Sequence, residues 1–184
     1  IAIQNYIFRN EPKKAGAYLS KFAKLMRLYL NNMRAEYVSI ADEIATLSFY
    51  LDMQRLRFNN AFNYKITKEG VVDDDITMFP TMVLQPLIEN AIEHGLKGQG
   101  HKGEIQIHFT LKNDFWLVEI ADNGIGYDGF KKDNKLQGKG KTSLSTAIIK
   151  ERITNFNKAE NKGYYIAFID LSERSKNDHG TVVC

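Results

Sequence analysis

Residues 103–122 carry the strongest structural pattern in the chain, because apolar and polar residues alternate there in two consecutive runs. The apolar positions of the two runs are Ile105, Ile107, Phe109 and Leu111, then Trp116, Val118 and Ile120. A period of two residues places every second side chain on the same face of a β-strand. Asn113 and Asp114, between the runs, are typical of a turn. The stretch therefore predicts a β-hairpin with one buried face.

Helical periodicity governs the residues near the amino terminus. Over residues 10–33, apolar side chains recur at helical spacing opposite a face rich in lysine and arginine. After a short link, Ser39 is typical of an N-cap, and a second apolar stripe continues as far as Phe58. The short connection predicts that the two helices run antiparallel.

The pattern becomes mixed beyond residue 59. A strand is predicted at 61–69 and a turn at the acidic residues 73–75, and the chain becomes helical after Pro86. Another helix is expected from about residue 143 to 157, followed by strands in "GYYIAFIDL" and "GTVVC". We therefore predict a helical region at 1–59 and an α+β domain at 60–184.

Composition excludes several classes of protein. With 43% apolar residues among 184, the chain can bury a core. Its formal net charge of +3 is far from the dense basic character of a nucleic-acid binder, so we expect no nucleic-acid partner. Cys184 is the single cysteine, which excludes an internal disulfide and a cysteine-based metal cluster. No apolar run approaches the roughly 20 residues that span a bilayer.

Four polar residues interrupt the apolar helix that follows Pro86. They are Glu89, Asn90, Glu93 and His94. A carboxamide oxygen such as that of Asn90 suits Mg²⁺, a hard cation that prefers oxygen ligands and keeps phosphates in its shell. The alternative is that Asn90 is an exposed amide. Glu89 is either a solvated carboxylate or one that orients water, and His94 is expected to line or pack against a site rather than act as a nucleophile.

A second motif, Asp122-x-Gly124-x-Gly126, follows directly on a predicted strand. On one interpretation it is a glycine turn in which Asp122 caps local amides. On the other, the glycines let a nucleotide approach the backbone closely, and the acceptor-only carboxylate of Asp122 binds the exocyclic amine of adenine. Guanine offers a carbonyl at that position and is repelled.

The segments "LQPLIENAIEHG", "ADNGIGY", "SLSTAIIKERI" and "GTVV" together resemble, in this order, the N, G1, G2 and G3 boxes of a known family. This is the GHKL ATP-binding fold of histidine kinases, type II topoisomerases, Hsp90-like chaperones and MutL. The sequences of these motifs are most similar to those of LytS-type sensor histidine kinases, and the resemblance covers nearly the whole chain. It implies a GHKL (Bergerat) α/β sandwich with a mixed sheet that binds ATP and Mg²⁺, preceded by part of a dimerising helical hairpin.

The resemblance also assigns roles to single residues. It implies that Asn90 is the magnesium ligand, and we predict Asn90 and Glu89 as the catalytic residues. It further implies Asp122 as the adenine contact, Gly124 and Gly126 as points where the nucleotide approaches the backbone, Thr181 as a contributor near the adenine, and a lid at 131–142. The nucleotide-binding residues that we predict are Asn90, His94, Asp122, Gly124, Gly126, Lys139, Lys141, Ser143, Leu144 and Thr181. The sequence departs from the family at Glu93, where a lysine is frequent, and at Ser143 and Ser145, where glycines are common. Lys139 and Lys141 either supply the missing positive charge or are solvated loop lysines.

The activity that the resemblance implies is transfer of the γ-phosphoryl group of ATP to a histidine and then to a response regulator. In this family the acceptor histidine lies in a motif upstream of the segment "IQNYI". His94, His101, His108 and His179 do not match it, so we expect this chain to lack the acceptor. We further expect a homodimer in the parent protein, and a cytoplasmic domain of a membrane-anchored bacterial protein.

Two alternative functions remain open. GHKL enzymes that hydrolyse ATP to drive a clamp use a glutamate four residues before the magnesium-binding asparagine, where this chain has Pro86, which cannot act as a base. The other alternative is a non-catalytic dimerisation module with a vestigial nucleotide site, which Glu93, Ser143 and Ser145 favour. A preference for ATP that depends on Mg²⁺ distinguishes a working site from a vestigial one.

Overall fold

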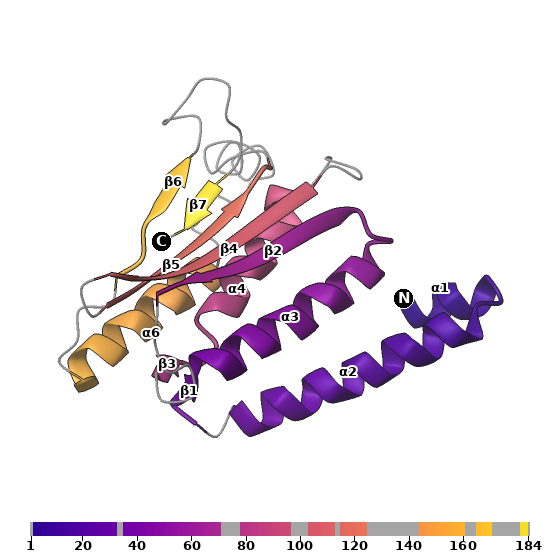
Figure 1. Ribbon diagram of the computed structural model, residues 1–184, viewed down its shortest axis with the longest axis horizontal. Coiled ribbons are helices and arrows are strands. Elements are labelled where there is room, and N and C mark those ends of the chain that lie inside the picture. Colours follow the sequence, from indigo (N-terminus) through magenta and orange to yellow (C-terminus); the bar gives the residue numbers. More distant parts are fainter. Residues whose placement is uncertain are drawn as a thin grey trace. The chain divides into compact units, whose positions relative to one another are not determined.

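The computed structural model describes residues 2–32, 35–70, 78–96, 103–112, 115–124, 144–160, 165–170 and 181–183 (Figure 1). Contacts divide the chain into two compact units. The first consists of Ile1–Ala61 and Val72–Thr81, and the second of Phe62–Val71 and Met82–Cys184. The chain therefore passes from the first unit to the second after residue 61 and again after residue 81.

Helices make up most of the first unit. They are α1 (Ala2–Phe8), α2 (Pro12–Asn32) and α3 (Ile40–Arg57). As predicted, α2 and α3 form an antiparallel hairpin (Figure 1). The Ser39 hydroxyl accepts the backbone N–H of Asp42 at 3.0 Å, which confirms the expected N-cap of α3. An ion pair of 2.8 Å between Lys21 and Asp52 joins the two helices.

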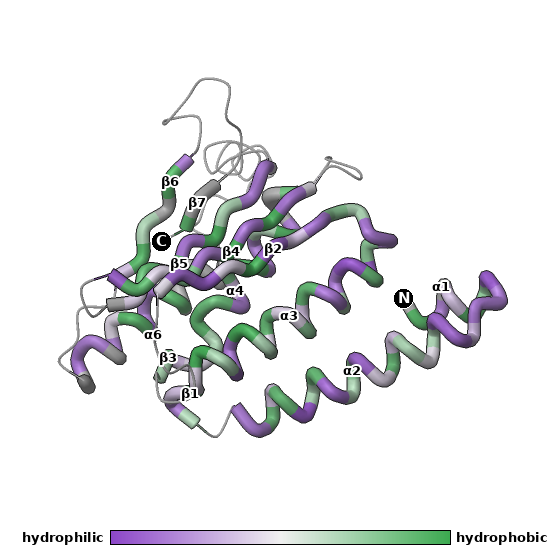
Figure 2. The backbone as a smooth tube through the Cα atoms, viewed as in Figure 1, coloured by the Kyte–Doolittle hydropathy of each residue, from purple (hydrophilic) through white to green (hydrophobic). Residues whose placement is uncertain are grey.

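The apolar side chains of α3 supply the interior of this unit. Leu47, Tyr50 and Leu51 are buried, as is Leu25 of α2. Hydrophobic residues recur along the length of α3 (Figure 2). The short α1 is tied to the end of α3, because the Tyr6 hydroxyl donates to the carbonyl of Leu56 at 3.0 Å.

A two-stranded antiparallel sheet lies beside these helices in the same unit. Its strands are β1 (Tyr37–Ser39) and β3 (Met78–Pro80). Thr81, which is 2% exposed, donates its hydroxyl to the carbonyl of Ala35 at 3.0 Å and its backbone N–H to that of Glu36 at 3.1 Å. We expected only a link at residues 34–38, because a three-residue strand is too short to show alternation.

The second unit contains a five-stranded mixed sheet, as expected. Its strands are β2 (Phe62–Glu69), β4 (Gly103–Lys112), β5 (Phe115–Asp122), β6 (Phe168–Asp170) and β7 (Thr181–Val183). Their order is β2-β4-β5-β7-β6, and only β2 and β4 are parallel among these neighbours. The predicted hairpin is the antiparallel pair β4–β5, with Ile107 opposite Ile120.

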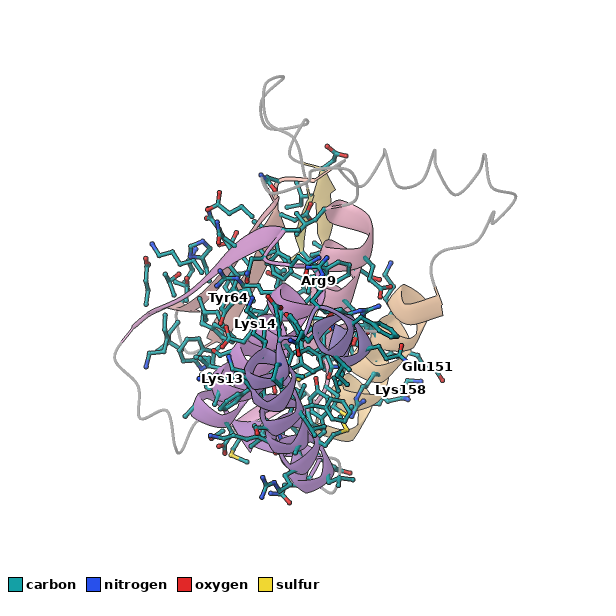
Figure 3. All side chains as sticks on the ribbon, turned by 90° about the vertical axis from the view of Figure 1, so that its right-hand side faces the viewer. Arg9, Lys13, Lys14, Tyr64, Glu151 and Lys158 are labelled. Atoms are coloured by element: carbon teal, nitrogen blue, oxygen red, sulfur yellow. The ribbon has the colours of Figure 1, made fainter. Side chains whose placement is uncertain are left out.

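One face of this sheet is covered by helices. Its buried side chains include Ile105, Ile107, Phe109 and Ile120. The covering elements are α4 (Leu84–Asn90), the π-helix η1 (Ala91–Gly95) and α6 (Leu144–Glu160), which lie on the same side (Figure 1). On α6, Ile149 is buried, whereas Glu151 and Lys158 are exposed and project outwards (Figure 3). The sheet therefore has one apolar face beneath helices.

The helix that was expected to begin after Pro86 starts two residues earlier, at Leu84. Proline is tolerated in a first turn because the first N–H groups of a helix have no partner within it. Backbone of positive φ lies beside both passages from the first unit to the second. Asn59 and Asn60 have φ of 53° and 58°, and Met82 has 57°. Asparagine tolerates this conformation readily, whereas for methionine it is uncommon.

Candidate functional site

A row of polar residues crosses three strands at one end of the sheet. Asp122, the last residue of β5, pairs with Thr181 of β7, and Thr181 pairs with Asp170 of β6. On the other side, Asp122 pairs with Ile105 of β4. Directly opposed residues share a sheet face, so this row lies on the face that the helices cover. The neighbouring row on that face is apolar and contains Ile107, Ile120 and Val183.

The carboxylate of Asp122 is buried, with 6% exposure. Its Oδ1 accepts the backbone N–H of Gly124 at 2.9 Å, so the local capping that we considered for this motif does occur. A carboxylate has about four acceptor sites on its two oxygens, and this bond uses one of them. The turn is also attached to β4, because Asn123 Oδ1 accepts the backbone N–H of Glu104 at 2.8 Å. Asp122 is therefore a buried acceptor held by its own turn.

Asn90 is the last residue of α4, at the point where the α-helix passes into η1. The backbone N–H of Leu96 donates to the carbonyl of Ala91 at 3.0 Å, an i to i+5 bond that defines the wider π turn. Such turns occur often at functional sites. Because η1 contacts β5, the structure brings the segment that follows Asn90 to the strand that ends at Asp122.

Other predicted residues are placed only in part. Glu89 is half-buried, and its Oε1 accepts from the Gln85 side chain at 2.8 Å, one helical turn earlier. Glu93 is exposed. The structure describes the backbone, but not the side chains, of His94 in η1, Leu144 at the start of α6 and Thr181 at the start of β7. Lying outside the described residues are Gly126, Lys139, Lys141, Ser143 and the expected lid at 131–142.

His108 of β4 lies on the sheet face opposite Asp122. Its Nδ1 is hydrogen-bonded to the hydroxyl of Thr67 on β2, and its Nε2 lies 3.3 Å from the side-chain oxygen of Gln106. Both ring nitrogens therefore already have partners, which does not suit a group that must attack phosphorus. His101 and His179 lie outside the described residues.

Two buried carboxyl groups were not singled out from the sequence. Asp170 is 5% exposed at the end of β6, and Glu43 is 4% exposed in the first turn of α3. Burial raises the pKa of Glu43 from 4.5 to about 7. In the sequence, a single acid at a strand end or in a first helical turn resembles a surface residue, because its burial depends on segments distant in the chain.

The described residues fit magnesium nucleotide better than a metal held by protein alone. No group of three or more histidine, cysteine, aspartate or glutamate side chains is placed to bind a metal within the described ranges. Mg²⁺ commonly takes one or two protein oxygens and completes its shell with water and substrate phosphates. A single carboxamide at Asn90 fits that arrangement, and a buried acceptor such as Asp122 fits the amine of an adenine.

Comparison with known proteins agrees with these features. Residues 1–62 match the family described as histidine kinase, and residues 76–184, more than half of the chain, match the family described as histidine kinase-, DNA gyrase B-, and HSP90-like ATPase. The sensor protein LytS of Staphylococcus epidermidis is 25% identical over 179 residues, which cover 97% of this chain and 29% of LytS. The sensor protein kinase HptS of Staphylococcus aureus is 27% identical over 181 residues, which cover 97% of this chain and 33% of HptS.

A solved structure shares the fold. The histidine kinase domain of a blue-light activated histidine kinase from Erythrobacter litoralis has a TM-score of 0.53 at 14% identity, covering 96% of this chain and 80% of that one. The chain spans about a third of the length of LytS and HptS. None of the helices described is both long and apolar enough to cross a membrane. The chain belongs to the family of histidine kinase-, DNA gyrase B- and HSP90-like ATPases, and its two matched segments identify it as the ATP-binding catalytic region of a LytS-type sensor histidine kinase.

Proposed function

We propose that this chain binds ATP with Mg²⁺ and transfers the γ-phosphoryl group to a histidine, from which it passes to an aspartate of a response regulator. The observation that supports this most strongly is the position of Asp122. Its carboxylate is 6% exposed at the end of a strand that the segment after Asn90 contacts. A base acceptor and an oxygen ligand for Mg²⁺ thus lie on neighbouring elements of one unit.

Each residue has a defined task in this proposal. Asp122 accepts from the exocyclic amine of adenine and repels the carbonyl of guanine. Asn90 offers its side-chain oxygen to Mg²⁺, which neutralises charge on the phosphates. Glu89, whose carboxylate Gln85 holds at 2.8 Å, positions the attacking group. Gly124 and Gly126 let the nucleotide approach the backbone, and Thr181 contributes beside the adenine.

The transfer exchanges one bond for another. A nitrogen of the acceptor imidazole forms a bond to the γ-phosphorus while the bond to the bridging oxygen breaks, and ADP leaves with that electron pair. A carboxylate oxygen of the response regulator then takes the phosphoryl group and releases the imidazole. The protein contributes mainly by positioning the two reactants and stabilising charge.

The acceptor is supplied by another helix in this proposal. In-line transfer needs an imidazole that can be brought to the γ-phosphate. His108 does not meet this need, because both of its ring nitrogens are already engaged within the sheet. We further propose that the parent protein is a membrane-anchored bacterial sensor and that this region is its cytoplasmic part.

Titration calorimetry of the 184-residue chain with ATP and ADP tests nucleotide binding. We expect binding that strengthens with Mg²⁺, and a loss of roughly tenfold or more of that Mg²⁺-dependent affinity in Asn90→Ala, because contacts to charged groups contribute about 1.5–3 kcal/mol. Asn63→Ala is the matched control, since Asn63 is exposed on the sheet face opposite the helices. If the wild-type chain binds no nucleotide, the proposed function is wrong and the non-catalytic dimerisation module is the remaining alternative.

Labelled ATP tests the transfer. The chain alone is expected to remain unlabelled. A longer form of the protein, which carries the acceptor histidine and the substitution Asn90→Ala, is expected to gain acid-labile label when it is incubated with the 184-residue chain. Stable acid-labile label on the 184-residue chain alone would show that the acceptor lies within it.

We also propose that α2 and α3 mediate homodimerisation. The exposed side chains of α2 include Leu19, Phe22 and Leu30, which are 55%, 40% and 63% exposed. Their spacing places them along one side of the helix, next to the stripe that contains the buried Leu25. Such a second apolar stripe is typical of helices that pack against another copy.

A charge placed in this stripe should weaken the dimer. We expect Leu30→Glu to raise the dimer dissociation constant about tenfold or more, because an ionised carboxylate must then be desolvated or the interface opened. Ser20→Glu carries the same charge at an exposed position away from the stripe and should leave the constant unchanged. Sedimentation equilibrium measures both. A longer form of the protein that contains the whole helical hairpin and is monomeric at all accessible concentrations contradicts the proposal.

A further inference from the structure

Gly103, the first residue of β4, has no role in the transfer proposed above. It is buried on the sheet face that the helices cover, and it pairs with Phe62 of β2. A methyl group on Gly103 would lie 2.9 Å from Cβ of Phe62 and 3.0 and 3.2 Å from Cδ1 and Cδ2 of Leu96. Glycine in a strand costs stability and often marks a place where another segment approaches closely. A side chain at position 103 therefore fits only if Phe62 or Leu96 moves.

Leu96 is the residue that closes the π turn. Its backbone N–H donates to the carbonyl of Ala91 at 3.0 Å, at the end of η1. Ala91 directly follows Asn90, the proposed ligand of Mg²⁺. The side chain of Leu96 is half-buried and lies against Gly103. The packing of one leucine on one glycine thus holds the end of the turn that begins beside Asn90.

The start of β4 is also attached to the turn that follows Asp122. The backbone N–H of Glu104 donates to Asn123 Oδ1 at 2.8 Å, and the backbone N–H of Asn123 donates to the carbonyl of Glu104 at 3.3 Å. Gly103, the residue before, holds the π turn through Leu96. Two neighbouring residues of β4 therefore fasten both halves of the proposed site, and the fixed rise along a strand sets the separation of these two attachments.

We propose that Gly103 and Leu96 are positioning residues of the nucleotide site, whose mutual contact fixes the π turn and so places Asn90 for Mg²⁺. This inference rests on the proposed function. Residues that support a metal ligand without touching the metal contribute about 10–100-fold to metal affinity in other sites. Loss of the contact should weaken the Mg²⁺-dependent part of nucleotide binding. The part contributed by the base should remain, because the pair of Glu104 and Asn123 is unchanged.

Leu96→Ala tests this role, because it shortens the side chain that reaches Gly103 and keeps every backbone N–H. Titration calorimetry with ATP, with and without Mg²⁺, gives the Mg²⁺ enhancement of affinity as a ratio of two dissociation constants. We expect this enhancement to fall about tenfold in Leu96→Ala and in Gly103→Ala, while ATP affinity without Mg²⁺ changes less than about twofold. Leu96→Met conserves the volume of the side chain and should retain the enhancement.

Amide hydrogen exchange of the nucleotide-free chain measures the contact without any metal. The Leu96 N–H closes the π turn, so its exchange rate reports the opening of that turn. We expect this amide to exchange on the order of tenfold faster in Gly103→Ala than in wild type, because the added methyl group displaces the leucine. An unchanged rate would show that the glycine does not hold the turn, and the inference would be wrong.

Gly70→Ala is the matched control for crowding at a glycine. A methyl group on Gly70 would lie 2.9 Å from Cβ of Leu111, at the other end of the β2–β4 pair, and the φ of Gly70 is 114°. This substitution should lower the melting temperature, as Gly103→Ala does. It should leave the Mg²⁺ enhancement and the exchange of the Leu96 amide unchanged. An equal loss of enhancement in both glycine variants would mean that general damage to the sheet is the cause.

The outcomes separate this inference from the proposed function. If Asn90→Ala removes the Mg²⁺ enhancement of wild type while Leu96→Ala and Gly103→Ala retain it, the inference is wrong and the proposed function stands. If Gly103→Ala does not fold, Leu96→Ala still decides, because it adds no atoms to the core. If the wild type binds no nucleotide, or binds it without Mg²⁺ enhancement, both fail.

Discussion

Asp122→Asn is expected to lower the affinity of the chain for ADP by about tenfold to a hundredfold. The substitution preserves size and leaves one oxygen that can still accept the Gly124 N–H, which Asp122 Oδ1 accepts at 2.9 Å in the structure. In the proposed site, what changes is the other half of the group, because an amide donor would then face the amine donor of adenine. A buried donor without an acceptor costs about 1–3 kcal/mol, and each 1.4 kcal/mol is about tenfold in affinity.

The comparison of two substitutions distinguishes the two roles of this carboxylate. Asp122→Ala removes both the bond to Gly124 and any contact with the base, whereas Asp122→Asn removes only the second. Titrations with ADP and GDP should show that the asparagine variant loses affinity for ADP and much of its preference over GDP. Equal ADP affinity in wild type and Asp122→Asn, with a loss only in Asp122→Ala, would mean that Asp122 serves the turn alone.

Glu43→Gln is expected to stabilise the folded chain near neutral pH and to have little effect in acid. Glu43 is 4% exposed, and burial raises its pKa from 4.5 to about 7. Between these two values the folded state holds a proton that the unfolded state has released, so folding stability decreases as pH rises through this window. The difference of about 2.5 pKa units corresponds to about 3 kcal/mol at most, since each unit is about 1.4 kcal/mol.

Urea denaturation followed by far-ultraviolet circular dichroism measures this effect. Below about pH 4.5 the wild type and Glu43→Gln should have similar free energies of unfolding, because both side chains are then uncharged. Above about pH 7 the variant should be more stable by up to about 3 kcal/mol. Glu36→Gln is the matched control, because Glu36 is exposed in the same unit. A difference between wild type and Glu43→Gln that does not vary with pH would indicate altered packing instead.

Local patterns predicted the elements whose residues lie close together in the chain. The hairpin at 103–122, the cap at Ser39 and the two antiparallel helices all depend on residues within a few turns or one tight connection. The mixed sheet followed from the family resemblance. The residue assignments at Gly126, Lys139, Lys141 and Ser143 remain predictions, because these residues lie outside the described ranges.

Pairing of distant segments was not predicted residue by residue. The strand β1 pairs with β3 some 40 residues later, and β2 lies parallel to β4. Parallel neighbours need a long crossover, so their register leaves no short-range signal. The sequence likewise does not predict the π turn after Asn90, because α- and π-helical hydrogen bonds join the same residue types.

The sequence by itself determined where the chain forms helices and the central hairpin, because the period of its apolar residues selects the side that can be buried. It also determined which residue types are available as acceptors and metal ligands, among them Asn90 and Asp122. Only the tertiary structure decided that Asp122, Thr181 and Asp170 form one row and that Glu43 is buried. The physical reason is that register and burial are properties of contacts between distant segments, and these contacts set the charge and hydrogen-bonding environment on which the chemistry of each carboxylate depends.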